Sequence, residues 1–172
     1  IMGWFLGEEK KKDFDIEKII KMALIHDLCE VYAGDTTPYD SILPKGKKKR
    51  RELMKTWPRF SEKEKKNLAD KKYKKEKEGL EKLIKDLPPK LKHQVKMLWL
   101  DYERGLSPEG RFFKQTDRVE SFLQAVEYWE TYKKPPQKPY WDQAKELYDD
   151  PVLLDFINNM DKRFHHTKKP KE

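Results

Sequence analysis

Cysteine is almost absent from the 172-residue sequence. Its single cysteine, Cys29, excludes an intramolecular disulfide and any structural zinc site that needs several thiolates. A chain with so little cysteine is typical of a reducing compartment, so we expect a cytoplasmic protein.

Long apolar runs are also missing. No run approaches the roughly 20 residues that span a bilayer, and the opening IMGWFLGEE lacks the basic leader and the length of a signal peptide. We therefore expect no membrane partner. The segment IMGWFLG, followed by charges, is typical of the last two turns of a helix that ends at Gly7. This pattern predicts that the natural N-terminus lies upstream of Ile1.

The chain contains enough residues, and enough large aromatic residues, for one hydrophobic core. Its length suits a single domain, and its 5 Trp, 8 Tyr and 8 Phe can anchor a core although 41% of the residues are charged. We expect one domain over residues 1–164 that is incomplete at its N-terminus. Residues 165–172 are expected to form a disordered basic tail.

Positive charge is concentrated in one segment. The formal net charge is +8, and residues 45–77 hold 16 of the 39 Lys and Arg but only 5 of the 31 Asp and Glu. This segment could bind the phosphates of a nucleic acid, or it could be a solvated helix or loop that mixes Lys with Glu. A third alternative is thermal adaptation through surface ion pairs.

Helical periodicity dominates the sequence. No run alternates apolar and polar residues as a half-buried strand does, so the sequence predicts an all-α fold. The clearest helix covers residues 13–34, with Asp13 or Asp15 as its N-cap and Gly34 at its end. Start and stop signals predict the other helices: one capped by Ser61, one through residues 80–87, one over 91–105 ended by Gly105, one over 107–130 capped by Ser107, and two short ones near Leu147 and over 153–160.

Three ionisable residues continue the apolar face of the helix over residues 13–34. Steps of three or four residues along that face lead to His26, Asp27 and Glu30. Burying one unpaired carboxylate costs several kcal/mol, which is more than a surface salt bridge returns. A divalent metal ion would offset this cost, because imidazole nitrogen and carboxylate oxygen are good ligands for zinc, manganese, iron or cobalt.

Such a metal site needs ligands from other helices as well. Asp117 is the candidate, because it borders the apolar face of the helix over residues 107–130. A simpler alternative is a hydrogen bond between His26 and Glu30, four residues apart, at a partly exposed turn. Spacing alone leaves both alternatives open.

Two sequence blocks resemble a known family. The segments MALIHDLCEVYAGDTTP and LWLDYERGLSPEGRFFKQTDRVESFLQAVEYW are similar to the two signature blocks of the HD-domain metal-dependent phosphohydrolases, in particular their small 5'-deoxynucleotidase branch. The segment KEKEGLEKLIKDLP resembles the helix between these blocks. The resemblance covers residues 1–35 and 74–160.

The resemblance implies an all-α HD-domain helical bundle with one divalent metal ion, which could be Mn, Co, Zn, Fe or Mg. Family members bind the ion through a first His, an adjacent His and Asp on the next helix, and an Asp on a later helix. The adjacent pair matches His26 and Asp27, and the later Asp matches Asp117. The first His has no counterpart in this sequence. Either the sequence lacks an upstream helix that carries this ligand, or the ion is bound by three protein ligands and added water. We favour the missing helix. Residues 45–73 are identified as a basic insertion.

The same resemblance implies an activity. Glu30 matches the family's catalytic acid, which positions or deprotonates the attacking water, and Asp35 matches a residue that contacts the nucleotide. Lys114 is also expected to bind substrate. The implied reaction is hydrolysis of a 2'-deoxyribonucleoside 5'-monophosphate to the nucleoside and phosphate, by a homodimer. Two alternatives stay open: hydrolysis of deoxynucleoside triphosphates or another nucleotide, and a module without catalysis that binds nucleic acid through residues 45–77.

Overall fold

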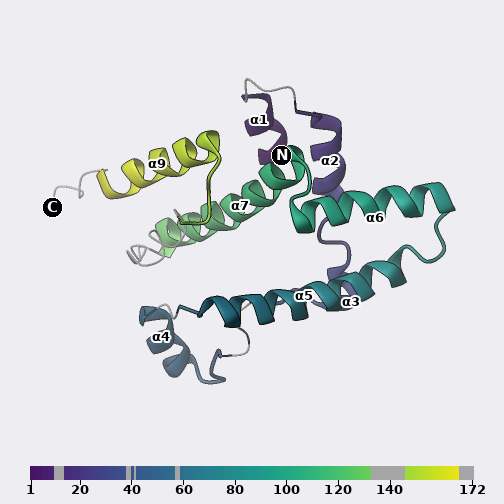
Figure 1. Ribbon diagram of the computed structural model, residues 1–172. Helices are drawn as coiled ribbons and strands as arrows, with labels where there is room; N and C mark the ends of the chain where they lie inside the picture. The colour runs from purple at the N-terminus through teal and green to yellow at the C-terminus, as the bar shows by residue number, and fades with distance from the viewer. Residues whose placement is uncertain (10–13, 38–39, 41, 57–58, 133–145, 167–172) are drawn as a thin grey trace.

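The computed structural model describes residues 1–9, 14–37, 40, 42–56, 59–132 and 146–166. Within these ranges the chain is helical and contains no strand, which confirms the predicted all-α fold. No helix in this part of the chain combines the length and the apolar character that a membrane span needs. The helices in Figure 1 are α1 (Met2–Glu8), α2 (Ile16–Ile25), α3 (Glu30–Ala33), α4 (Lys47–Thr56), α5 (Glu62–Leu83), α6 (Pro89–Arg104), α7 (Pro108–Tyr132) and α9 (Pro151–His166).

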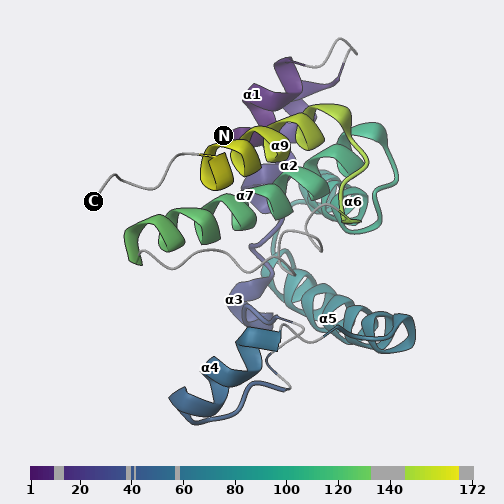
Figure 2. The ribbon, with the colours of Figure 1, turned by 90° about the vertical axis from the view of Figure 1, so that its left-hand side faces the viewer.

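Two hydrophobic clusters organise these helices. Around the larger cluster, α2 packs against α1, α6 and α7, and α9 packs against α7. The smaller cluster joins the turn after α2 to α5 and α6, and Figure 2 shows α3, α4 and α5 below the other helices. Buried members of the larger cluster include Ile19, Met22, Phe112, Phe113, Val119, Phe122, Val126, Leu153 and Ile157, and those of the smaller are Cys29, Leu80, Ile84 and Trp99.

Four predicted helix boundaries are confirmed by local geometry. Asp15 Oδ1 accepts a hydrogen bond from a backbone N–H in the first turn of α2, at 2.9 Å. Ser61 forms a capping box at the start of α5, and Ser107 Oγ accepts a backbone N–H from the first turn of α7 at 3.1 Å. Gly105 ends α6 in the left-handed conformation, with φ of 58°. The alternative cap Asp13 lies outside the described residues.

The prediction that Gly7 ends the first helix is wrong. The helix α1 continues through Glu8, and Gly7 is buried inside it. A Cβ at this position would lie 3.0 Å from the Ile16 side chain. The glycine therefore allows α1 to approach α2 closely.

The predicted single helix over residues 13–34 is also wrong, because it is broken. Between α2 and α3, residues 26–29 form tight turns in which Leu28 N–H and Glu30 N–H bond to carbonyls three residues earlier, at 3.2 and 2.9 Å. Two tertiary contacts explain the break: the His26 ring packs on aromatic side chains of α6 and α7, whereas Cys29 is buried in the smaller cluster. Gly34 ends α3 as predicted, with φ of 74°.

A partly buried ion pair links α2, α6 and the start of α7. Lys18 Nζ lies 2.7 Å from Asp101 Oδ2, and Asp101 Oδ1 accepts the backbone N–H of Ser107 at 2.8 Å. Burial alone would raise the pKa of Asp101, but hydrogen bonds from Lys18 and Ser107 outweigh burial and lower it. Gly110 has no Cβ that would collide with this carboxylate. These contacts hold α7, which carries Asp117, beside α2, which ends just before His26.

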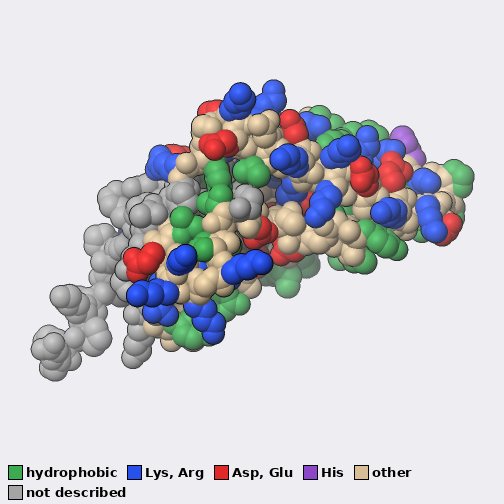
Figure 3. Space-filling model, turned by 90° about the horizontal axis from the view of Figure 1, so that it is seen from below, with side chains coloured by type: hydrophobic (Ala, Val, Ile, Leu, Met, Phe, Trp, Pro, Cys, Tyr) green, Lys and Arg blue, Asp and Glu red, His purple; other side chains and the backbone are tan. Residues whose placement is uncertain are grey.

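The basic segment is not a separate unit. It forms α4 and the first half of α5, so its predicted end at residue 73 falls inside one continuous helix. The side chains of residues 47–52 are exposed, and Lys and Arg mix with Asp and Glu on the face that Figure 3 shows. This distribution is typical of a solvated surface.

The C-terminal region follows the predictions in part. The helix α9 contains the predicted segment 153–160 and extends to His166, so it continues two residues into the predicted tail. Residues 167–172, and residues 133–145 before the predicted helix near Leu147, lie outside the described residues.

The contact between α3 and α5 depends on Gly79. A Cβ at Gly79 would lie 2.5 Å from the carbonyl oxygen of Cys29 and 3.3 Å from the backbone nitrogen of Ala33. Real Cβ atoms do not approach backbone oxygen this closely, so a side chain here must push α5 away from the turn that holds His26 and Glu30.

We therefore expect Gly79→Ala to destabilise the protein by about 1–3 kcal/mol, because overpacking exceeds the gain of roughly 1 kcal/mol that alanine brings to a helix. Urea unfolding measures the change. Gly46→Ala is the matched control, since a Cβ at Gly46 meets no atom within 4 Å. An unchanged free energy of unfolding for Gly79→Ala would contradict the close contact.

Candidate functional site

His26 lies at the end of α2, with its ring held by two aromatic side chains. The ring centroid is 5.1 Å from that of Tyr102 and 5.2 Å from that of Phe113, both in edge-on geometry. The Nδ1 atom is 3.0 Å from the carbonyl oxygen of Ala23, one helical turn earlier. An Nδ1–H group that donates to this carbonyl leaves Nε2 directed at the acidic residues.

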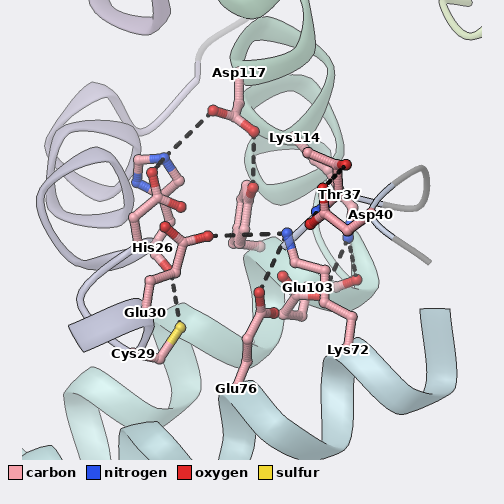
Figure 4. Close-up of polar contacts among 12 residues, drawn as sticks. His26, Cys29, Glu30, Thr37, Asp40, Lys72, Glu76, Glu103, Lys114 and Asp117 are labelled. Atoms are coloured by element: carbon pink, nitrogen blue, oxygen red, sulfur yellow. Dashed lines mark hydrogen bonds and ion pairs between the residues drawn. The ribbon is translucent and has the colours of Figure 1, made fainter. Parts of the chain in front are cut away.

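Two carboxylates from different parts of the chain meet at His26. Its Nε2 lies 3.0 Å from Asp27 Oδ2 and 3.4 Å from Asp117 Oδ1. Figure 4 shows Asp117 on α7 facing the His26 ring across the gap between the helices. The structure therefore brings together the three residues predicted as metal ligands, which we call the HD cluster.

The two carboxylates favour a charged His26 when no metal is bound. Burial alone would lower the pKa of His26, but hydrogen bonds to Asp117 and Asp27 outweigh burial and raise the pKa to about 10. The imidazolium then places one positive charge between two negative ones. A divalent ion would take the place of that proton, because only deprotonated Nε2 can bind metal.

Asp117 is held in place by the hydroxyl of Tyr102, a buried residue of α6. The hydroxyl of Tyr102 donates a hydrogen bond to Asp117 Oδ2 at 2.9 Å. Burial alone would raise the pKa of Asp117, but hydrogen bonds from His26 and Tyr102 lower it. The carboxylate therefore stays ionised, with Oδ1 directed at His26.

Glu30 begins α3, next to the HD cluster in Figure 4. Its side chain is 21% exposed and lies 3.9 Å from the Nζ of Lys72 on α5. Burial, followed by the negative charges of Asp27 and Asp35, raises the pKa of Glu30 above its ordinary value. A carboxylate with a raised pKa is suited to accept a proton near neutral pH.

The two predicted substrate residues lie in different places. Asp35 is exposed after α3, close enough to Glu30 for its charge to act on that carboxyl. Lys114 donates a hydrogen bond to the backbone oxygen of Glu103 at 2.7 Å and lies 5.3 Å from the ring of Tyr102. Lys114 also lines a cavity of about 430 Å³ between α6, α7 and the segment before α9, which none of the other predicted site residues lines.

Sequence reasoning missed Tyr102, Lys72 and Glu76. Lys72 Nζ is 3.2 Å from Glu76 Oε1, and the Glu76 side chain is only 5% exposed. The i,i+4 spacing of Lys72 and Glu76 is a recognisable helical pair, but nothing in the sequence says that it faces Glu30. His93 is exposed on α6 and lies outside this group of residues.

The donors of the HD cluster suit a divalent ion. In the described part of the chain, no group of three or more His, Cys, Asp or Glu side chains already surrounds a common position for an ion. The two distances from His26 Nε2 nevertheless match the roughly 3–3.4 Å that separates ligands bound at about 2.1 Å to one ion. One nitrogen and two carboxylates are also the donor types that such ions accept. Replacing the shared proton by an ion therefore requires small side-chain movements.

Comparison with known proteins agrees with this architecture. The sequence profile of the family described as HD domain matches residues 1–149. The chain therefore belongs to the HD-domain family, as the two sequence blocks indicated.

Three relatives illustrate its place in the family. The chain is 30% identical over 154 residues to 5'-deoxynucleotidase HDDC2 of Xenopus laevis, covering 89% of this chain and 63% of the relative. It is 27% identical over 146 residues to 5'-deoxynucleotidase HDDC2 of Homo sapiens, covering 84% and 59%. For 5'-deoxynucleotidase YGK1 of Saccharomyces cerevisiae the identity is 28% over 142 residues, covering 82% and 56%. The chain thus spans about three fifths of the length of these relatives.

The charge on His26 predicts a pH-dependent contribution to stability. Because the folded-state pKa is about 10 and the ordinary value about 6.5, the charged pairs stabilise the metal-free protein fully below about pH 6.5. This contribution is lost as the pH rises toward 10. With chelator present, the difference in unfolding free energy between wild type and His26→Gln should shrink by a few kcal/mol between pH 6 and pH 10.

Urea unfolding at a series of pH values measures this difference. His93→Gln is the matched control, because His93 is exposed on α6 and its substitution should leave the unfolding free energy close to that of wild type. A constant difference for His26→Gln would show that His26 is not held as a cation.

Proposed function

We propose that this protein is a metal-dependent 5'-deoxynucleotidase that hydrolyses 2'-deoxyribonucleoside 5'-monophosphates to the nucleoside and phosphate. The observation that carries the proposal is the meeting of His26 with Asp27 and Asp117, at 3.0 and 3.4 Å, beside Glu30. The names of the relatives, all 5'-deoxynucleotidases, support the substrate class.

One divalent ion would be held by His26 Nε2 and by the carboxylates of Asp27 and Asp117. When bound, it would polarise a phosphate oxygen and lower the pKa of water. Asp117 is kept ionised for this purpose by the Tyr102 hydroxyl, and the bond from Nδ1 to Ala23 fixes the orientation of the imidazole. The proposal includes Mn, Co, Zn, Fe and Mg as candidates.

Glu30 would act on the attacking water. Its raised pKa favours proton transfer near neutral pH, and its place at the start of α3 puts the carboxylate next to the HD cluster. In this proposal Glu30 accepts a proton from the water that attacks phosphorus. The bond between phosphorus and the 5' oxygen breaks, and the proton taken from water is returned to that oxygen, which gives the nucleoside and phosphate. Asp35 and Lys114 are proposed to contact the nucleotide, and the homodimer and the cytoplasmic location remain predictions.

The activity test is phosphate release from a panel of nucleotides with added manganese or cobalt. We expect release from deoxynucleoside 5'-monophosphates, with much less from ribonucleotides, triphosphates and cyclic nucleotides. Asp27→Ala and Glu30→Gln should each lower kcat by at least about 100-fold, since each removes a group with a direct role in the reaction.

A matched control is Glu78→Gln, which removes an exposed carboxylate on α5 and should leave the rate unchanged. Circular dichroism confirms that each variant is folded. No phosphate release from any nucleotide would overturn the proposal, and faster release from triphosphates would replace it with the triphosphate alternative.

A further inference from the structure

A lysine that the sequence analysis did not single out lies between two carboxylates at the edge of the HD cluster. Lys72 on α5 points toward α3, with its Nζ 3.2 Å from Glu76 Oε1 and 3.9 Å from Glu30 Oε1 (Figure 4). The side chains of Glu76 and Glu30 are 5% and 21% exposed. The ammonium group of Lys72 therefore forms ion pairs with both the nearly buried carboxylate of Glu76 and the proposed catalytic carboxylate of Glu30.

The position of the ammonium is set by Glu76. A carboxylate this deeply buried needs a cationic partner, and Lys72 provides one from a single turn earlier on the same helix. Burial and the negative charge of Glu103 raise the pKa of Glu76, whereas the positive charge of Lys72 lowers it. Burial is the largest of these effects. Because the carboxylate of Glu76 is buried, it draws the ammonium inward, toward α3.

Lys72 remains a cation under working conditions. Burial alone would lower the pKa of Lys72, but the carboxylates of Glu76 and Glu30 outweigh burial and raise it above the ordinary value. A lysine ammonium has three N–H donors and no acceptor. It can therefore bind Glu76 and still attract the ionised form of Glu30.

Among the residues that the structure describes, the other charges that act most strongly on Glu30 are negative. Asp27 precedes α3 and Asp35 follows it, and both disfavour the ionised carboxylate, as does Glu76 on α5. Lys72 is the cation that opposes these charges at Glu30. The separation of 3.9 Å is an ion pair without a tight hydrogen bond, so the oxygen atoms of Glu30 remain available to water.

We propose that Lys72, anchored by Glu76, is a positioning residue that holds the Glu30 carboxylate next to the HD cluster. This inference rests on the proposed function, because it assigns Lys72 a role in the proton transfer that Glu30 carries out. Gly79 contributes to the arrangement by letting α5 lie against the turn before α3.

Lys72→Met tests the proposal, because methionine keeps most of the side-chain volume and removes the charge. We expect kcat to fall about tenfold with KM within about twofold, and the acid limb of the pH–rate profile to move up by about one pH unit. Lys72→Arg should restore most of the rate, since it keeps a cation. Lys74→Met, on the opposite face of α5 and exposed, should behave as wild type.

A double-mutant cycle separates positioning from a direct role. In the Glu30→Gln background, Lys72→Met should have no further effect, because Lys72 acts through Glu30. An equal loss of rate in both backgrounds, or a raised KM with unchanged kcat, would overturn the proposal in favour of direct contact between Lys72 and the substrate.

A measurement without catalysis keeps this test independent of the proposed function. NMR titration of the side-chain carboxyl carbons in the metal-free protein reports the pKa of Glu30. We expect Lys72→Met to raise that pKa and Lys74→Met to leave it unchanged. If the protein hydrolyses no nucleotide but the pKa responds in this way, only the proposed function fails; an unchanged pKa would overturn the role of Lys72.

Discussion

The interaction on which the site depends is the pairing of one partly buried imidazole with two carboxylates. His26 ends α2, Asp27 follows it directly, and Asp117 comes from α7, so the pairing forms only if the two helices hold a fixed distance. The packing of α2 on α7 is supported by the ion pair of Lys18 with Asp101, whose carboxylate also binds Ser107 at the start of α7. Asp117 is partly buried and Asp27 is exposed, and the imidazolium between them offsets the repulsion between the two carboxylates.

The break between α2 and α3 places Glu30 next to the pairing of His26 with Asp27 and Asp117 (Figure 4). A continuous helix would carry Glu30 onward in line with α2, whereas the tight turn lets His26 pack on the larger cluster and Cys29 on the smaller one. The α5 helix can approach this turn because Gly79 has no side chain. The proposed metal ligands, Glu30 and Lys72 come from three parts of the chain and meet where the two hydrophobic clusters adjoin.

Local signals in the sequence predicted much of the fold. Asp15, Ser61 and Ser107 were recognised as caps because capping depends on a few neighbouring residues. The broken helix and the role of Gly7 were not predicted, because both result from contacts with distant helices. Periodicity likewise identified His26, Asp27 and Asp117 as candidates, and the family resemblance joined them. The contribution of Tyr102 and Lys72 could not be predicted, because a helical pattern shows which residues share a face and not which faces meet.

The central claim is that the HD cluster is a binding site for one divalent ion. Anomalous X-ray diffraction from crystals soaked in manganese tests it most directly. The account predicts one strong peak at about 2.0–2.3 Å from His26 Nε2 and from the carboxylate oxygens of Asp27 and Asp117. Saturating manganese that gives no peak there, with Asp27 and Asp117 still bonded to a protonated His26, would contradict it.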